Sequence, residues 1–156
     1  ECLAKALAKE KAGKGTWEAA EQLIESFCKT RGIFSEGHNA ADGSGLAGEN
    51  NVTCKQLVSV LEYMDTHGMK EQWRSTLPQG QKRGSLKVRF NNIPEADRIF
   101  GKTGSIGGVR SLSGFVVDAN GREVYYAVVL NDLPDKEVSK GMALIDKIAV
   151  ELAKSK

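Results

Sequence analysis

"VRSLSGFVVDANGREVYYAVVLND", Val109–Asp132, carries the strongest local signal in this chain. Two runs rich in β-branched and aromatic residues stand on either side of D-A-N-G, and this composition favours half-buried strands. Within the turn, Asn120 and Gly121 can adopt the positive φ angles that a tight hairpin requires. The stretch therefore predicts an antiparallel β-hairpin.

The segments that flank this hairpin predict a further strand before it and a helix after it. On its N-terminal side, Ser85–Phe90 reads S-L-K-V-R-F, in which Leu86, Val88 and Phe90 alternate with polar residues as in a half-buried strand. On its C-terminal side, D-L-P-D-K-E leads into a predicted helix that ends in lysines, which suit the negative end of the helix dipole. The predicted apolar stripe of that helix comprises Val138, Met142, Ile145, Ile148 and Leu152.

The region 1–83 is predicted to be helical apart from one long loop. A helix over 2–11 ends at a Gly-rich stop, and Thr16 is placed to cap a second helix. Residues 35–51 are rich in Gly, Ser, Asn and Asp, and loops of this length in a compact domain often have a function. A Thr-x-x-Gln capping box at 53–56 predicts the start of a third helix.

Helices followed by antiparallel strands and a terminal helix predict an α+β fold, with helices packed on an antiparallel sheet. The length of 156 residues suits one sizeable core. We therefore expect a single unit over 1–156, with the strands and the C-terminal helix in 84–156.

The composition narrows the class of partners. The 22 basic and 20 acidic residues leave a net charge of +2, so no strong field points to nucleic acid or to an anionic membrane. No apolar run has the length of a transmembrane segment, and no signal peptide is visible. Cys2, Cys28 and Cys54 lack metal-ligand spacing, so we expect no cofactor or metal and interpret these cysteines as small buried residues.

The segment "IFGKTGSIGG", Ile99–Gly108, permits two kinds of chemistry. Ala96-x-x-x-x-Gly101-Lys102-Thr103 falls one glycine short of a phosphate-binding loop, and a predicted strand follows where such a loop needs a helix. We therefore set nucleotide binding aside.

The other possibility is that Lys-Thr-Gly lies on an edge strand and binds a peptide. Lys102 would supply a fixed positive charge, Thr103 a hydroxyl for a carboxylate, and Gly104 room for a ligand backbone to approach. The competing interpretation is an ordinary Gly-rich strand start with a solvent-facing lysine, which the triplet alone does not exclude.

Other candidate groups have simpler structural explanations. Ser26-x-x-Lys29 has the spacing of a serine nucleophile and its lysine base, but it ends an amphipathic helix that has its own reason to pack. His38 and His67 have no Cys or carboxylate at ligand spacing, and we interpret both as solvated or hydrogen-bonded structural residues. The loop segment Asp42–Gly45, which contains the candidates Asp42 and Ser44, fits either a substrate contact or a rigid turn.

Taken in order, these segments resemble the C-terminal part of the D-alanyl-D-alanine carboxypeptidase/endopeptidase family, the class C low-molecular-mass penicillin-binding proteins. The resemblance rests on the ordered series "GKGTWEAAEQLIESFCKTRGI", "DGSGLAGENNVTCKQLVSVLEYM", "GSLKVRF", "GKTGSIGGVRSLSGFVVDANGREVYYAVVLND" and the terminal helix. No single triplet carries it, and it covers nearly the whole chain.

The resemblance implies a penicillin-recognising serine hydrolase fold, similar to that of β-lactamases, and a periplasmic or extracytoplasmic location. Such enzymes cleave peptidoglycan stem peptides through an acyl-enzyme and react with β-lactams. By resemblance, Lys102 would polarise the site, Thr103 would bind the terminal carboxylate, and the amide of Ser105 would form half of the oxyanion hole. Gly104 and Ile106 complete the substrate-binding strand, which would pair with the substrate backbone.

Two of the three family motifs are expected to lie outside this chain. The resemblance places S-x-N just before Glu1 and the nucleophile of S-x-x-K further upstream, so the isolated chain is expected to be inactive. Ser26 aligns with a helix end and not with that nucleophile.

Relatives often continue D-G-S-G-L with Ser-Arg, whereas Ala47-Gly48 here lacks the basic group that could meet an acidic substrate side chain. The alternative function is a non-catalytic module that binds peptidoglycan peptide or a partner chain.

Overall fold

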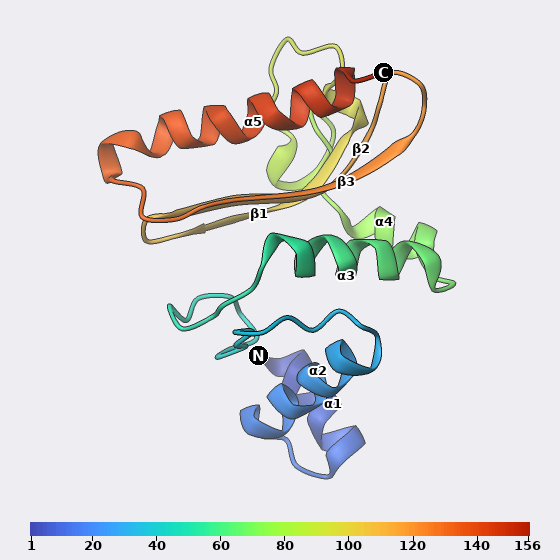
Figure 1. The fold of residues 1–156 in the computed structure, drawn as a ribbon, viewed down its shortest axis with the longest axis vertical. Coiled ribbons are helices and arrows are strands. Elements are labelled where there is room, and N and C mark those ends of the chain that lie inside the picture. The colour runs from blue at the N-terminus through green and yellow to red at the C-terminus, as the bar shows by residue number, and fades with distance from the viewer. The chain divides into compact units, whose positions relative to one another are not determined.

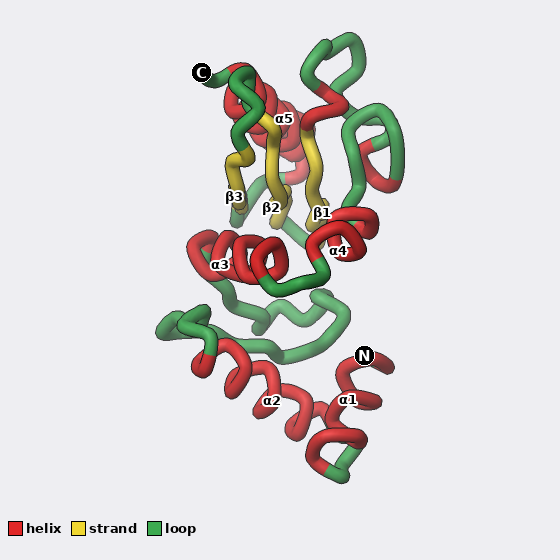
Figure 2. Tube along the Cα trace, turned by 90° about the vertical axis from the view of Figure 1, so that its right-hand side faces the viewer, coloured by secondary structure: helices red, strands yellow, loops and turns green.

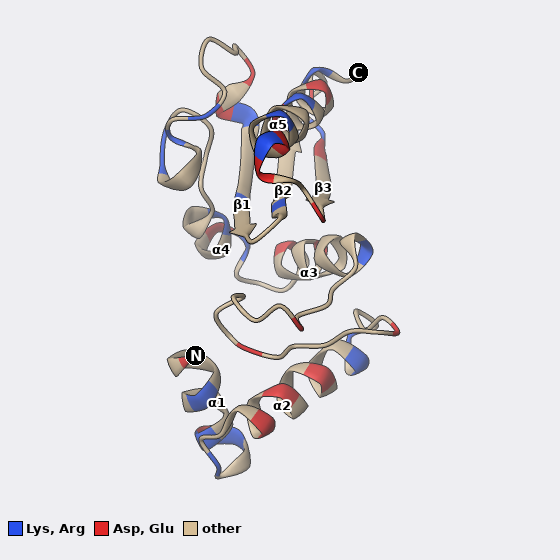
Figure 3. Cartoon of the chain, turned by 90° about the vertical axis from the view of Figure 1, so that its left-hand side faces the viewer, with Lys and Arg blue, Asp and Glu red and all other residues tan.

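The computed structural model describes residues 1–156. Its internal contacts divide the chain into two compact units, Glu1–Gln56 and Leu57–Lys156, and each unit is described by itself. The expectation that 1–156 forms a single unit stays a prediction. Basic and acidic side chains are both spread along the chain (Figure 3), in keeping with the net charge of +2.

Two helices form the apolar cluster of the first unit. α1 (Cys2–Ala12) ends where Gly13 adopts a left-handed conformation at φ 72°. α2 (Trp17–Thr30) begins after Thr16, whose hydroxyl accepts a hydrogen bond from the amide of Ala19 at 3.3 Å. The two helices pack through the small residues Ala8, Ala19 and Ala20. Both predicted helices and the Thr16 cap are confirmed.

The loop after α2 closes on itself before it enters α3 (Cys54–Thr66). Asn39 and Asn51 form an isolated antiparallel bridge, with amide-to-carbonyl distances of 3.0 and 2.9 Å. The hydroxyl of Thr53 accepts a hydrogen bond from the amide of Gln56 at 3.1 Å, and the side-chain oxygen of Gln56 accepts one from Ser35 at 2.9 Å. The predicted start of the third helix is therefore confirmed.

A three-stranded antiparallel sheet is the centre of the second unit (Figure 2). The strands β1 (Ile99–Ile106), β2 (Val109–Val117) and β3 (Glu123–Leu130) lie in the order β1-β2-β3, so β1 and β3 are its edges. α5 (Val138–Lys154) covers one face of this sheet (Figure 1). The shorter elements are α4 (Lys70–Thr76), η1 (Gly84–Leu86), η2 (Ala96–Arg98) and η3 (Asp135–Glu137).

The core of this unit lies between α5 and the sheet. Ile99 of β1 and Leu112 and Val116 of β2 are fully buried, and they belong to the same cluster as Ile145 and Ala149 of α5. Burying each of the Ile, Leu and Val side chains contributes about 1.5–3 kcal/mol before the entropy cost of ordering it. This packing confirms the predicted α+β class, with a helix on an antiparallel sheet.

The buried face of α5 differs from the predicted stripe. The buried residues follow a spacing of four, through Gly141, Ile145, Ala149 and Ala153, with Val150 beside them. Of the predicted stripe only Ile145 is fully buried, and Met142 is 37% exposed. The prediction is wrong here because small residues let the helix approach the sheet closely: a Cβ at position 141 would lie 3.3 Å from a methyl carbon of Leu130 on β3. No helix in the structure has the length and apolar character to span a membrane.

The predicted hairpin is confirmed, but its turn differs in detail. Gly121 has a positive φ of 78°, whereas Asn120 does not. The carboxylate of Asp118 organises the turn instead, since its Oδ1 accepts hydrogen bonds from the amides of Asn120 and Arg122 at 2.9 and 2.8 Å. Burial of Asp118 favours a higher pKa, but these hydrogen bonds and the guanidinium of Arg122 outweigh it and hold the pKa below its usual value.

The predicted strand at 85–90 is absent. Gly84–Leu86 forms a short 3₁₀ helix, and the chain then turns sharply because Phe90 and Asn92 have φ angles of 61° and 60°. Leu86 and Phe90 are buried in the core, while Val88 between them is 77% exposed. Two buried residues four positions apart also fit a helical turn, so the alternation was misleading.

Candidate functional site

The Lys-Thr-Gly segment lies on β1, an edge of the sheet, as predicted. A short segment, 78–80, covers only the start of the outer side of β1. The amide of Gly80 donates to the carbonyl of Ile99 at 2.9 Å, and the amide of Gly101 donates to the carbonyl of Pro78 at 3.0 Å. From Lys102 onward, no further strand pairs with this edge.

The alternation of an antiparallel ladder defines which backbone groups face this open edge. A residue in such a strand directs its N–H and C=O to the same side, and the side changes with each residue. Ile99 and Gly101 face segment 78–80, so Thr103 and Ser105 direct their backbone groups outward in the same way. The edge thus offers the N–H and C=O groups of two alternate residues, Thr103 and Ser105.

The side chains of the strand divide between the two faces of the sheet. Thr103 pairs with the buried Leu112, so it shares the face that α5 covers, as does Ser105 two residues on. Lys102 is on the opposite face, is exposed, and donates from Nζ to the carbonyl of Thr103 at 2.5 Å. The lysine charge and the threonine hydroxyl therefore approach the edge from opposite faces.

Gly104 has a steric reason to be glycine. It stands directly across the ladder from Ser111, and a Cβ at position 104 would overlap the hydroxyl oxygen of that serine. A larger residue would require Ser111 to rotate. The absence of a side chain leaves the backbone at this point accessible.

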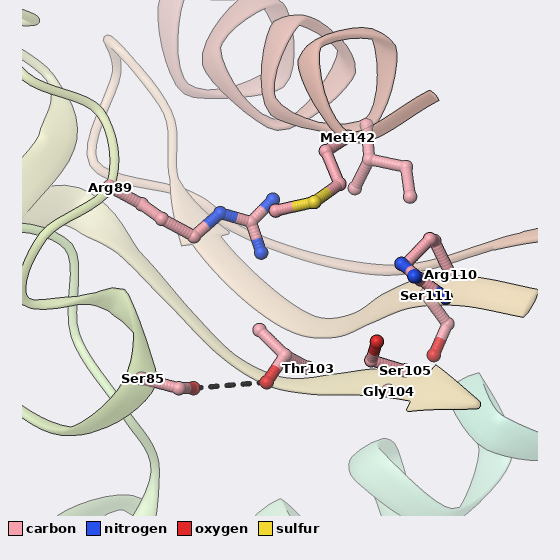
Figure 4. A pocket seen from close by; sticks show the side chains of 9 residues that line it. Ser85, Arg89, Thr103, Gly104, Ser105, Arg110, Ser111 and Met142 are labelled. Carbon is pink, nitrogen blue, oxygen red and sulfur yellow. Dashed lines mark hydrogen bonds between the residues drawn. The ribbon is translucent and has the colours of Figure 1, made fainter. Parts of the chain in front are cut away.

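A pocket of about 170 Å³ opens beside the strand (Figure 4). Its lining includes Ser85, Arg89, Thr103, Ser105, Arg110 and Met142. The hydroxyl of Thr103 donates to that of Ser85 at 3.1 Å. In Figure 4 the guanidinium of Arg89 lies beside Met142, while Arg110 lies close to Ser105. The wall next to the Lys-Thr-Gly strand is therefore rich in hydroxyls and guanidinium groups.

The loop candidate Asp42 is the centre of a hydrogen-bond network within the first unit. Its carboxylate accepts hydrogen bonds from the hydroxyl of Ser44 at 2.6 Å and from the side-chain amide of Asn50 at 2.8 Å. It also accepts from the amides of Gly45, Leu46 and Ala47. The hydrogen bonds from Ser44 and Asn50 hold the pKa of Asp42 far below its usual value. Asp42 and Ser44 thus shape the turn, and a substrate contact by either one stays a prediction.

The two rejected motifs have ordinary structural roles. Lys29 forms an ion pair with Glu25 at 2.6 Å, so the structure gives it a surface role on the helix. Lys102 and Thr103 lie within a strand and not at the start of a helix, so the arrangement of a phosphate-binding loop is absent.

The histidines and cysteines are only partly as expected. His67 stacks on Tyr63 with 3.7 Å between ring centroids, as a structural residue. His38 differs from the prediction, because both of its ring nitrogens are buried without a hydrogen-bond partner and the ring packs edge-on against Phe34. Cys28 is buried as expected, whereas Cys2 and Cys54 are exposed. No group of three or more His, Cys, Asp or Glu side chains could hold a metal ion.

Sequence reasoning missed the residues that reach the strand from elsewhere. Ser85, Arg89 and Arg110 line the pocket, yet no motif marks them. Arg110 could be found only from the strand register, which pairs it with Ser105. Ser85 and Arg89 were hidden by the incorrect strand prediction at 85–90.

An ion-pair network on the other face of the sheet was also missed. Asp65 of α3 is paired with Arg74 at 2.5 Å and with Lys70 at 3.0 Å, and it accepts a hydrogen bond from the hydroxyl of Tyr125 at 2.6 Å. Burial favours a higher pKa for Asp65, but these three partners outweigh it and lower the pKa. Burial and the neighbouring Asp65 raise the pKa of Tyr125 to about 12. Arg74 also pairs with Glu123, so the network joins α3 and α4 to β3.

Comparison with family models and curated proteins gives consistent matches. A family model described as the D-Ala-D-Ala carboxypeptidase 3 (S13) family matches residues 1–152. The chain is 31% identical over 158 residues to a D-alanyl-D-alanine carboxypeptidase of Actinomadura sp. (strain R39), covering 98% of this chain and 29% of that protein. It is 30% identical over 146 residues to the penicillin-sensitive carboxypeptidase A of Dictyostelium discoideum, covering 89% of this chain and 27% of that protein. The chain thus spans less than a third of the length of these curated relatives.

Solved structures support the same likeness. Penicillin binding protein 4 (dacB) from Haemophilus influenzae matches with a TM-score of 0.87 and 26% sequence identity, covering 98% of this chain and 36% of that one. A structure of the same protein complexed with a novel β-lactam matches with a TM-score of 0.88. The fold predicted from the sequence, a part of a penicillin-recognising hydrolase fold, is therefore confirmed.

Proposed function

This chain belongs to the D-Ala-D-Ala carboxypeptidase 3 (S13) family, and on that basis we propose that it supplies the Lys-Thr-Gly strand of a serine acyl-transfer site. The substrate class is a peptidoglycan stem peptide that ends in D-Ala-D-Ala, cleaved through an acyl-enzyme. The Actinomadura relative carries the name of that activity. β-Lactams are the corresponding inhibitors, since the Haemophilus influenzae relative has been solved in complex with one.

Each residue of the strand has a role in this proposal. Lys102 contributes the positive charge that polarises the reacting groups, and Thr103 offers its hydroxyl to the terminal carboxylate of the peptide. The outward amide of Ser105 donates one of the two hydrogen bonds that stabilise the developing oxyanion. Gly104 leaves room for the substrate backbone, and Ile106 ends the pairing surface.

The open edge of β1 is the observation that carries the proposal. Segment 78–80 ends its pairing at Gly101, so no strand pairs with the outward backbone groups of Thr103 and Ser105, and only the carbonyl of Thr103 has a partner, Nζ of Lys102. An extended peptide can add to such an edge as a further strand, which fixes the scissile bond relative to side chains on either face.

The nucleophile in this proposal comes from sequence outside the chain. Residues 1–156 contain one S-x-x-K, at Ser26–Lys29, and no S-x-N. Lys29 is paired with Glu25 and does not act as the base. We therefore propose that the isolated chain is inactive, that the other two motifs complete the site in the full-length gene product, and that this product works in the periplasm or another extracytoplasmic space.

Covalent labelling with a fluorescent penicillin tests this function. The full-length gene product should form an adduct that survives denaturation, and the isolated chain should not. Lys102→Ala should slow labelling of the full-length protein by two or more decades, which corresponds to the loss of about 3 kcal/mol of transition-state stabilisation. Lys136→Ala removes an exposed lysine outside the strand and is the matched control.

Two results would overturn the proposal. Unchanged labelling in Lys102→Ala would remove this lysine from the mechanism. Labelling of the isolated chain that disappears in Ser26→Ala would place the nucleophile inside the chain.

The alternative proposal is a module that binds peptidoglycan peptide, or a partner chain, without hydrolysis. The lack of S-x-N within residues 1–156 favours it if the full-length gene product also lacks that motif. Reading the complete gene for S-x-x-K and S-x-N distinguishes the two, because an enzyme needs both.

A further inference from the structure

An arginine of α4 covers the sheet on the face that carries Lys102. On this face the rings of Phe100, Phe115 and Tyr125 form one row across β1, β2 and β3, because each stands opposite the next in the strand register. Phe100 and Phe115 stack with 4.6 Å between their centroids and 9° between their planes. The guanidinium of Arg74 lies over the ring of Phe115, 4.5 Å from its centroid, in a cation–π contact. Arg74 thus covers the middle of a row that ends two residues before Lys102.

A closed ring of four ion-paired side chains fixes this guanidinium. Arg74 pairs with Asp65 of α3 and with Glu123 of β3, both at 2.5 Å. Lys70 pairs with the same two carboxylates at 3.0 and 3.3 Å. Arg74 is the less exposed cation, with 15% of its side chain accessible against 39% for Lys70. The planar fork of an arginine can reach two carboxylates and stack on an aromatic ring at once, whereas a lysine presents a single compact charge.

The backbone of Arg74 is connected to the edge of β1 by a second route. α4 runs directly into segment 78–80, which pairs with β1 as far as Gly101. Arg83 fastens this connection, since its Nη2 donates to the carbonyl of Arg74 at 3.0 Å and its Nε donates to the carbonyl of Leu77 at 2.9 Å. A shift of α4 would therefore move the segment that covers the start of the edge.

Both routes end at the residues immediately before Lys102. The stacked rings connect Arg74 to Phe100, and the backbone route connects it to Gly101. The side chain of Lys102 is exposed, and its Nζ donates to the carbonyl of the adjacent Thr103. The direction in which this lysine leaves the sheet is therefore set by the backbone at 100–101. Correct orientation of a reacting group can account for a large part of a rate enhancement.

We propose that Arg74 is a positioning residue for acyl transfer, which holds the backbone before Lys102 where the lysine charge can reach the reacting groups. The proposal rests on the proposed function, because it names what orients the lysine of that site. The ring of ion pairs contains two positive and two negative charges, so Arg74 acts through geometry and not through a net charge near Lys102. No bond is made or broken at Arg74.

Hydrogen exchange tests the hold of Arg74 on the edge without any reaction. The amides of Gly80 and Gly101 donate the two backbone hydrogen bonds between segment 78–80 and β1, so their exchange reports this pairing. In the full-length gene product, Arg74→Met should speed the exchange of both amides at least tenfold. The amide of Leu133 donates to the turn between β1 and β2, at the other end of the strand, and should exchange as in the wild type.

Lys70→Met is the matched control. It removes the same charge from the same ring of ion pairs and leaves the guanidinium of Arg74 over Phe115. It should change the exchange of the two amides, and the rate of acylation, by less than threefold. Effects as large as those of Arg74→Met would overturn the proposal, because the loss of a charge would then explain both variants.

Stopped-flow labelling with a fluorescent penicillin separates positioning from folding. The rate constant of acylation reports the geometry of the molecules that react, and the amplitude reports the fraction of molecules that can react. In the full-length protein, Arg74→Met should lower the rate constant at least tenfold and leave the amplitude unchanged. A lower amplitude with a normal rate constant would show a purely structural role and overturn the proposal, as would unchanged exchange of the two amides.

Failure of the proposed function gives a different result. A wild-type full-length protein that the penicillin does not label would reject acyl transfer, and the role of Arg74 in that step with it. Labelling of the wild type and of Arg74→Met at the same rate would keep acyl transfer and reject only the role of Arg74.

Discussion

Two adjacent tyrosines on β3 allow a matched test of the energetics of the second unit. Tyr125 and Tyr126 project to opposite faces of the sheet. The hydroxyl of Tyr125 donates to the carboxylate of Asp65 at 2.6 Å, whereas the hydroxyl of Tyr126 is buried in the core without a partner. Replacing each by phenylalanine removes one oxygen atom and nothing else.

Only the substitution of Tyr125 is expected to destabilise the protein. A hydrogen bond to a charged group contributes about 1.5–3 kcal/mol. In Tyr125→Phe the carboxylate of Asp65 keeps Arg74 and Lys70, so we expect a loss near the lower end, about 1.5 kcal/mol. In Tyr126→Phe the desolvation penalty of an unpaired hydroxyl disappears, and we expect no loss or a gain of up to about 1 kcal/mol.

Equilibrium urea unfolding of the two variants measures this difference. The free energies of unfolding should differ by about 2 kcal/mol, with Tyr126→Phe the more stable. In thermal unfolding this corresponds to roughly 4–8 °C for a chain of this length. If Tyr126→Phe is the less stable variant, the hydroxyl of Tyr126 has a partner in solution and the reasoning fails.

Three further predictions follow from the geometry. Ile145→Ala should cost about 2–5 kcal/mol of unfolding free energy, and Met142→Ala less than about 1 kcal/mol, because only Ile145 is on the buried face of α5. Urea unfolding measures both values, and the reverse order would mean that the helix packs through the stripe predicted from the sequence. Asp42→Asn should speed hydrogen exchange of the amides of Gly45, Leu46 and Ala47, which donate to that carboxylate, and unchanged exchange would show that the turn holds without the charge. The folded pKa of Tyr125, about 12, exceeds its unfolded value of 10.0, so the stability that Tyr125 contributes is fully present below pH 10 and is lost as the pH rises through 12. The unfolding free energies of the wild type and Tyr125→Phe should therefore converge over that pH range. A constant difference between them would contradict the raised pKa.

The predictions of secondary structure were correct where a local sequence pattern is compatible with only one structure. The hairpin around Asp118–Arg122 and the helix after Thr53 are of this kind, because turn residues and capping residues act on their immediate neighbours. The segment 85–90 failed because Leu86 and Phe90 are compatible with two periods, and the choice depended on positive φ angles that an aromatic residue rarely adopts.

For the candidate site, too, the sequence predicts some of the residues and only the structure reveals the others. Lys102–Ile106 could be proposed from a motif, since the residues that matter are consecutive in the sequence. The place of Arg110 opposite Ser105 depends on strand register, and the contact between Asp65 and Tyr125 joins residues 60 positions apart. Contacts of this kind leave no periodic trace in the sequence, so only the folded chain reveals them.

The short segment 78–80 limits the length of peptide that can pair with the edge of β1. It occupies the edge as far as Gly101, and the strand ends at Ile106, so only Thr103 and Ser105 have outward backbone groups available. An incoming peptide can therefore form at most about four backbone hydrogen bonds, each with a net value of about 0.5–1.5 kcal/mol. A sum of roughly 2–6 kcal/mol must also offset the entropy of association, so the backbone can set the register of a peptide but cannot hold it tightly. Affinity must then come from the side chains at the two ends of this two-residue window, and a longer peptide would gain nothing from β1 itself.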